Sequence, residues 1–256
     1  MFKTLSYAIL VIMLCLAVFT TSCTTTPVSH EETNHLEKAR CFEDMHDYEE
    51  AVRCYSKAAG QGDADGQAGM GYIYYQGLSV EQDYNAALKW FSKAAKQGNA
   101  RAQNNLGGMY YYGHGVEQNN EEALKWFRKA AEQGYEATQN NLAVMYETGQ
   151  GVKQDFIEAV KWYRAAAEQG SPDAQYHLGG MYALGHGVEH DLKEMFRWYR
   201  KAAEQGHMVS QYNIGIMYEN GQGVEQNHQE AVKWFRRAAE QGFESADSEL
   251  KRLGAE

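Results

Sequence analysis

Residues 99–134 read NARAQNNLGGMYYYGHGVEQNNEEALKWFRKAAEQG, and this 36-residue pattern recurs along most of the chain. Its clearest marker is a tryptophan that returns every 36 residues, at Trp90, Trp126, Trp162, Trp198 and Trp234. A Gln-Gly pair ends each unit in the same register, as at Gln133 and Gly134. A fixed period of about 20–50 residues is typical of stacked supersecondary units rather than of one globular core. The sequence therefore predicts a repeat array.

Each unit is predicted to form two helices joined by a loop. In residues 99–134 the first helix is expected from about Ala100 to Tyr112, with Leu106 and Tyr110 on one apolar stripe. Gly113 is expected to end that helix, as glycine does at a left-handed cap. The second helix carries apolar and small residues at spacings of three and four, namely Ala123, Trp126, Phe127, Ala130 and Ala131. One such hairpin cannot bury its apolar face alone, whereas a stack of them can.

These hairpins predict an all-α fold, an α/α superhelical solenoid of about six helix–loop–helix repeats with a C-terminal capping helix. The expected repeats are residues 35–62, 63–98, 99–134, 135–170, 171–206 and 207–242. Residues 243–256 follow as a short charged helix, which suits the polar cap that an open array needs at its end.

The pattern resembles the Sel1-like repeat, a relative of the tetratricopeptide repeat with a longer loop between its helices. In one unit the resemblance rests on Ala102, Leu106, Gly107, Met109, Tyr110, Gly113, His114, Gly115, Val116, Ala123, Trp126, Phe127, Ala130, Ala131 and Gly134. It covers roughly residues 35–242, although the loop of the first unit is four residues shorter, so that residues 35–62 look like a plain tetratricopeptide hairpin. The resemblance implies an adaptor that binds other proteins in secretion, envelope assembly or host contact.

The N-terminus is predicted to direct export rather than to join the fold. Lys3 precedes an apolar run over residues 5–19, which is short for a membrane span and is typical of a signal peptide, here residues 1–22. The following Cys23 resembles the lipidated cysteine of bacterial lipoproteins, although Thr20 stands where that signal usually has leucine. Residues 23–34 would then form a flexible tether.

The lipoprotein resemblance also implies a location. No aspartate follows Cys23, which implies the outer membrane, with the array facing the periplasm. Two alternatives are cleavage with release of a soluble periplasmic or secreted protein, and an uncleaved membrane anchor. Contact with the membrane is expected only through the lipid anchor.

Two cysteines of the first repeat form a candidate disulfide. Cys41 and Cys54 stand where later repeats have methionine and tryptophan, on opposite helices of one hairpin. In an oxidising compartment a disulfide that closes this short loop would contribute on the order of 3 kcal/mol. The alternative is two buried free thiols that act as small core residues.

Charge and composition exclude nucleic acid as a partner. The chain has a formal net charge of -10 and no run of basic residues, whereas binding to phosphate backbones needs clustered Lys and Arg. We therefore expect a protein or peptide partner.

Catalytic and metal-binding motifs are weak, and neither an active site, a cofactor nor a metal site is predicted. Ser248 and Lys251 match the Ser-x-x-Lys motif of penicillin-recognising enzymes, but no Ser-Asp-Asn or Lys-Thr-Gly accompanies them. His30 and His35 flank Glu31 at a spacing of five, so one helical face cannot present both imidazoles to zinc.

Function is expected on the concave surface, which the first helix of each repeat lines in such stacks. The candidate peptide-binding residues are Tyr72, Tyr75, Asn104, Tyr111, Tyr112, Asn140, Tyr176 and Tyr212. Asn104 and Asn140 lie one period apart, and their amides could pair with the backbone of an extended peptide, while tyrosine rings supply contact area. The alternative is that these residues form a solvated polar face and half-buried packing.

The leading hypothesis is a non-catalytic envelope adaptor that binds a protein or peptide. A second hypothesis is β-lactam binding or weak β-lactamase activity, as described for cysteine-rich relatives of this repeat, whose repeats each carry a cysteine pair. A third is a permanent structural subunit of an envelope or export complex.

Overall fold

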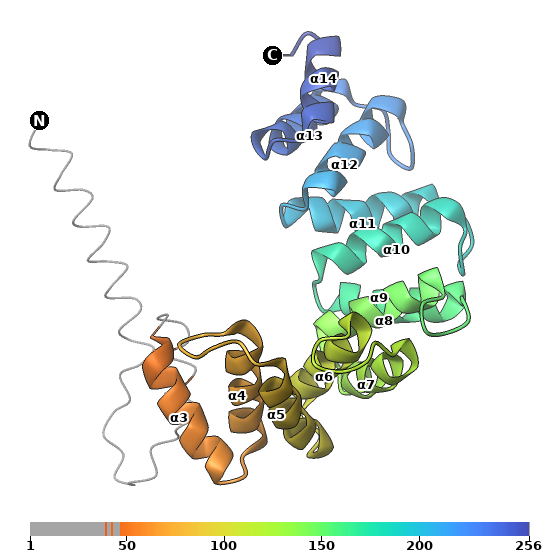
Figure 1. Cartoon of the computed structure of the whole chain (residues 1–256). Coiled ribbons are helices and arrows are strands. Elements are labelled where there is room, and N and C mark those ends of the chain that lie inside the picture. Colours follow the sequence, from red (N-terminus) through yellow and green to blue (C-terminus); the bar gives the residue numbers. More distant parts are fainter. Residues whose placement is uncertain (1–38, 40–41, 43–46, 256) are drawn as a thin grey trace, which may run out of the picture.

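The computed structural model describes residue 39, residue 42 and residues 47–255, and within that part the chain is helical and contains no strand. Its helices are α3 (Tyr48–Gly60), α4 (Ala64–Gln76), α5 (Tyr84–Lys96), α6 (Ala100–Tyr112), α7 (Asn120–Glu132), α8 (Glu136–Thr148), α9 (Phe156–Glu168), α10 (Pro172–Leu184), α11 (Leu192–Glu204), α12 (Met208–Asn220), α13 (His228–Glu240) and α14 (Glu244–Arg252). Figure 1 shows them as hairpins stacked in chain order along a curved path. The predicted all-α solenoid is confirmed.

Several predictions concern segments that this structure leaves out. The signal peptide, Cys23 with its tether, and Cys41 lie outside the described residues. Cys54 is buried in α3, so its pairing with Cys41 stays a prediction. None of the helices in the described part is long and apolar enough to cross a bilayer.

Caps set the ends of the helices in every hairpin. The first helices end at left-handed glycines, namely Gly77, Gly113, Gly149, Gly185 and Gly221. The second helices begin after a residue whose side-chain oxygen accepts a hydrogen bond from the first turn, namely Asp83, Asn119, Asp155, Asp191 and Asn227. The observed bounds of α6 match the range expected from the sequence.

The core of each hairpin is an aromatic ring laid on a residue without a bulky side chain. Phe127 of α7 packs on Gly107 of α6, where an added Cβ would lie 2.6 Å from the ring. The same pairing joins Phe91 to Gly71, Tyr199 to Gly179 and Phe235 to Gly215. These rings are at most 6% exposed. In these four hairpins the close approach of the two helices depends on glycine at this register, where α8 has the small Ala143.

The tryptophans are less buried than the period alone leads one to expect. An internal position predicts burial of Trp126, Trp162 and Trp198 between hairpins, but Trp126 and Trp162 are only half-buried and Trp198 alone is buried. Each of the five rings has a Lys or Arg cation over it, as Lys129 lies 4.4 Å from the centroid of Trp126. The aromatic residue after the tryptophan is buried in all five of these repeats.

A chain of glutamine side chains links the hairpins. Gln139 of α8 is buried, donates from Nε2 to the carbonyl of Ala131 at 3.2 Å, and accepts at Oε1 from Gln169 at 2.7 Å. The first of these bonds reaches the preceding hairpin and the second stays within its own. The glutamine–glutamine bond recurs in each of the five later repeats, as the pairs Gln97–Gln67, Gln133–Gln103, Gln169–Gln139, Gln205–Gln175 and Gln241–Gln211. The Gln of the Gln-Gly marker thus has a structural role.

The last helix, α14, closes the stack. Leu250 is buried and lies 36 residues after Ile214 of α12, so α14 occupies the place of a further first helix. The Glu219 carboxylate joins the two helices through Arg252 at 3.2 Å and also contacts His228 at 2.6 Å. The hydrogen bond to His228, with a smaller contribution from the bond to Arg252, holds the pKa of Glu219 below its usual value.

Candidate functional site: the face of the first helices

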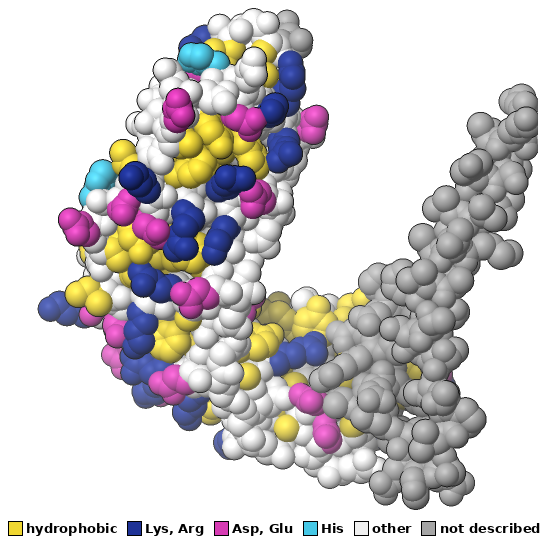
Figure 2. All heavy atoms as spheres, turned by 180° about the vertical axis from the view of Figure 1, so that it is seen from behind, with side chains coloured by type: hydrophobic (Ala, Val, Ile, Leu, Met, Phe, Trp, Pro, Cys, Tyr) yellow, Lys and Arg dark blue, Asp and Glu magenta, His cyan; other side chains and the backbone are white. Residues whose placement is uncertain are grey.

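The first helices α4, α6, α8, α10 and α12 present one face, which we call the A-helix face. It consists of the residues at the registers of Asn104, Asn105, Gly108 and Tyr111 in each repeat. This face is poor in positive charge, because Arg101 is the one Lys or Arg in these five helices. Most Lys and Arg lie on the second helices, and Figure 2 shows many of them gathered on one face of the molecule.

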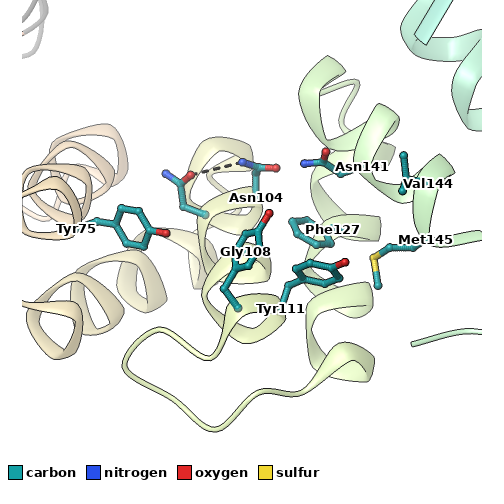
Figure 3. Close-up of a pocket in the computed structure, with 10 residues that line it drawn as sticks. Tyr75, Asn104, Gly108, Tyr111, Phe127, Asn141, Val144 and Met145 are labelled. Carbon is teal, nitrogen blue, oxygen red and sulfur yellow. Dashed lines mark hydrogen bonds between the residues drawn. The ribbon is translucent and has the colours of Figure 1, made fainter. Parts of the chain in front are cut away.

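A pocket of about 310 Å³ opens on the A-helix face. It spans three consecutive first helices, from Tyr75 of α4 across α6 to Met145 of α8 (Figure 3). Its lining consists of Tyr75, Asn104, Asn105, Gly108, Tyr111, Tyr112, Phe127, Asn141, Val144 and Met145. No acidic or basic side chain occurs among these residues. The pocket is therefore suited to an uncharged group with both apolar and hydrogen-bonding parts.

Loops of the following repeat hold the tyrosines of the pocket in place. The Tyr75 hydroxyl lies 2.8 Å from Nδ1 of His114, and the ring of His114 stacks on Tyr84. One repeat later, the Tyr111 hydroxyl donates to the side chain of Gln150. Burial, followed by the neighbouring tyrosine hydroxyls, raises the pKa of Tyr75, so that this hydroxyl stays protonated and can donate. Both rings are thus positioned before a ligand arrives.

The asparagines of the pocket differ in how far they are engaged. The Asn104 carbonyl oxygen accepts a 2.7 Å hydrogen bond from Thr138, and its Nδ2 lies 3.4 Å from Oδ1 of Asn105. Asn141 is exposed at the opposite wall, on α8. Asn105 and Asn141 therefore carry the amide groups that are most open to a ligand.

The structure brings four of the eight predicted residues together in this pocket, namely Tyr75, Asn104, Tyr111 and Tyr112. The other four lie apart from it. The Asn140 Oδ1 is buried and accepts no hydrogen bond within the described part of the chain. Tyr72 lies under the guanidinium of Arg101. The two remaining residues are Tyr176, which stacks on Tyr199, and Tyr212, which packs on Phe235 and Phe243.

Six lining residues were not among the predicted ones: Asn105, Gly108, Phe127, Asn141, Val144 and Met145. A signal for two of them is present in the sequence, because Asn105 and Asn141 form their own register one period apart. Gly108 also has a signal, since the same register holds Tyr72 in α4 and Val144 in α8. This signal is found by aligning the repeats and noting where one has glycine and its neighbours have a larger side chain.

A second polar cluster lies further along the A-helix face. The Tyr163 hydroxyl donates to Glu147 at 2.5 Å, and the ring of His177 stacks on Tyr163 at 4.9 Å between centroids. Burial lowers the pKa of His177, although the carboxylates of Glu147 and Asp173 oppose this. Burial raises the pKa of Tyr163. The imidazole is thus favoured in its neutral form, stacked as an aromatic ring.

Neither a catalytic nor a metal-binding arrangement emerges in the described part. The Ser248 hydroxyl donates to the carbonyl of Glu244 at 3.1 Å, which is the ordinary bond of a helical serine to the preceding turn. Within the described residues no group of three or more His, Cys, Asp or Glu could hold a metal ion.

These features define a helical repeat scaffold, and comparison with known families identifies its kind. A family model described as "Sel1 repeat" matches residues 45–63, 64–99, 100–135, 137–171, 172–207 and 209–243. The chain therefore belongs to the Sel1 repeat family. Proteins with this repeat are generally scaffolds for protein interaction, and the fold is typically non-catalytic.

Two solved structures show the same architecture. One is a protective antigen of uropathogenic Escherichia coli with an SLR fold, 40% identical, with a TM-score of 0.76 over 79% of this chain and 44% of that one. The other is a Sel1 repeat protein from Oxalobacter formigenes, 32% identical, with a TM-score of 0.76 over 84% of this chain and 86% of that one. The chain thus spans less than half of the antigen. A search of curated proteins finds no match.

Proposed function

We propose that this protein is a non-catalytic scaffold of the bacterial cell envelope that binds a protein or peptide partner on its A-helix face. The observation that carries the proposal is the uncharged pocket across α4, α6 and α8, with aromatic rings and open amides on its walls. Membership of the Sel1 repeat family supports a protein partner. The envelope location rests on the export signal expected in residues 1–23.

Binding should depend on the two open amides. Replacing Asn105 and Asn141 together with alanine is expected to weaken partner binding by about 1–3 kcal/mol, or roughly five- to 150-fold, since each hydrogen bond contributes about 1 kcal/mol. The melting temperature should not fall, because alanine is the better helix former at both positions. The measurement is quantitative capture of partners from an envelope extract on immobilised wild-type and variant protein.

Asn213 provides the control for this experiment. It occupies the same register two repeats after Asn141 and does not line the pocket. Asn213→Ala should capture the partner as the wild type does. A partner retained equally by the Asn105/Asn141 double variant would place the binding site elsewhere on the array. Absence of any specific partner in repeated captures would count against the scaffold function itself.

The membrane anchor is proposed at Cys23. Cys23→Ser should shift the protein from the membrane fraction to the soluble periplasmic fraction and remove the acyl mass, because single acyl chains add membrane affinity in proportion to their length. Fractionation followed by mass spectrometry of the N-terminal peptide measures both effects. A wild-type protein that is already soluble and unacylated would rule the anchor out.

A further inference from the structure

The pocket opens beside a helix residue that has no side chain, Gly108. At the register of Gly108 the other first helices carry Tyr72, Val144, Gly180 and Ile216. A Cβ atom added to Gly108 would meet nothing within 4 Å, so the glycine faces open space rather than a packed neighbour. At Gly180 an added Cβ would come within 3.8 Å of the Tyr199 hydroxyl. Gly108 is therefore not required by helix packing, unlike Gly107 beside it.

The space over Gly108 has an apolar floor and a polar rim. Phe127, Val144 and Met145 supply the carbon surface of the floor and far wall, and Tyr111 adds a ring (Figure 3). Amide groups of Asn105 and Asn141 stand at the rim. A cavity of about 150 Å³ accommodates benzene. At about 310 Å³ this pocket has room for a large side chain and part of the backbone that carries it.

We infer that the pocket over Gly108 anchors one large uncharged apolar side chain, such as leucine, methionine or phenylalanine, from an extended segment of a partner protein. This inference rests on the proposed function and specifies which kind of side chain of the partner the scaffold recognises. The peptide groups on either side of the anchor pair with Asn105 and Asn141. A charged side chain is excluded, because the pocket offers no counter-charge and burial of an unpaired charge is costly.

The direct test uses the smallest molecule with this chemistry, N-acetyl-leucinamide, which carries the leucine side chain between two amides. Binding is followed by the methyl signal of Met145 in protein labelled at methionine methyl groups. Met109, Met181 and Met217 occupy the same register in other repeats and serve as internal references. The signal is assigned with a Met145→Leu variant.

We expect a saturable shift of the Met145 signal alone, with a dissociation constant in the millimolar range for so small a ligand. The methionine and phenylalanine analogues should also shift the Met145 signal saturably, and the aspartate and lysine analogues should not. Equal shifts from charged and apolar analogues would overturn the inference, as would no shift at any concentration. Binding of N-acetylglucosamine with a lower dissociation constant would overturn it in favour of a saccharide site.

A matched pair of variants tests the role of the glycine. Gly108→Val should place a branched side chain in the pocket and weaken N-acetyl-leucinamide binding more than tenfold, while the melting temperature stays equal or rises. Valine is compatible with this position, since Val144 holds the same register in α8. Gly180→Val, two repeats away, should leave binding at Met145 unchanged. Full binding to a folded Gly108→Val variant would overturn the anchor assignment.

Failure of the anchor and failure of the scaffold function give different results. If an envelope partner is captured by the wild type and by Gly108→Val alike, the scaffold function holds and the anchor inference fails. If N-acetyl-leucinamide binds at Met145 but envelope extract yields no partner, the pocket chemistry holds and the proposed function fails.

Discussion

Replacing Phe91 with alanine should destabilise the array by about 3–5 kcal/mol, as truncation of a core phenylalanine does. The ring is fully buried and lies directly on Gly71, so its loss leaves a cavity between α4 and α5 that neither helix can close. Chemical denaturation measures the free energy of unfolding. Hydrogen exchange should show that α4, α5 and the hairpins beside them loosen before the distant repeats, because each repeat contacts only its neighbours.

The neighbouring residue gives the control. Trp90 is half-buried, with the ammonium of Lys93 4.6 Å from the centre of its ring. Trp90→Ala should therefore cost less than Phe91→Ala, although tryptophan is the larger side chain and marks the period in the sequence. A larger effect for Trp90→Ala, or uniform loosening of all the hairpins, would contradict this account of the core.

The second large effect is expected at the glutamine chain. Gln139→Leu removes both of its hydrogen bonds and leaves the carbonyl of Ala131 with the bond from the Gly134 N–H. A buried hydrogen bond contributes about 1 kcal/mol, so the loss of two should cost about 1–3 kcal/mol, and the apolar replacement restores neither bond. Since this bond crosses from one hairpin to the next, α7 and α8 should separate more readily. Urea denaturation and hydrogen exchange of these two helices measure the effect.

An exposed glutamine of the same repeat, Gln154, serves as the control, because it has the same side chain as Gln139 without the burial. Gln154 donates to the carbonyl of Glu147 at 2.8 Å but is exposed, so water can replace its bond. Gln154→Leu should cost well under 1 kcal/mol. Equal costs at Gln139 and Gln154 would show that the inter-hairpin bond contributes no special stability.

The fold could be predicted from the sequence because its signals are local and repeated. The 36-residue period indicates a stack of helical hairpins. Gly113 indicates where the first helix of its repeat ends, so the bounds of α6 follow from residues within the repeat itself. Burial of particular rings could not be read in this way. Trp126 and Phe127 recur with the same period, and only the packing of α7 against α6 places Phe127 inward and leaves Trp126 half-buried.

The site was harder to predict for a related reason. Register alone selects Tyr75, Asn104 and Tyr111, which all reach the pocket. It also selects Asn140, one period after Asn104, although the pocket takes its wall on α8 from Asn141. The equivalents of Asn105 and Gly108 in the next repeat, Asn141 and Val144, line the pocket, whereas the equivalent of Asn104 does not. The 36-residue period therefore identifies residues that are equivalent in successive repeats. It does not show which of them lie close together in the structure.

The terminal helix α14 has a consequence for how such a protein can change its size. Because Leu250 stands where a seventh repeat would place its own first-helix residue, the end of the array is a truncated copy of its interior. If 36 residues were duplicated between two hairpins, the new hairpin would have neighbours on both sides that already carry the matching helix caps, aromatic rings and glutamine partners. Length can thus evolve in whole steps without redesign of the junctions, and each added unit brings fresh, independently variable surface.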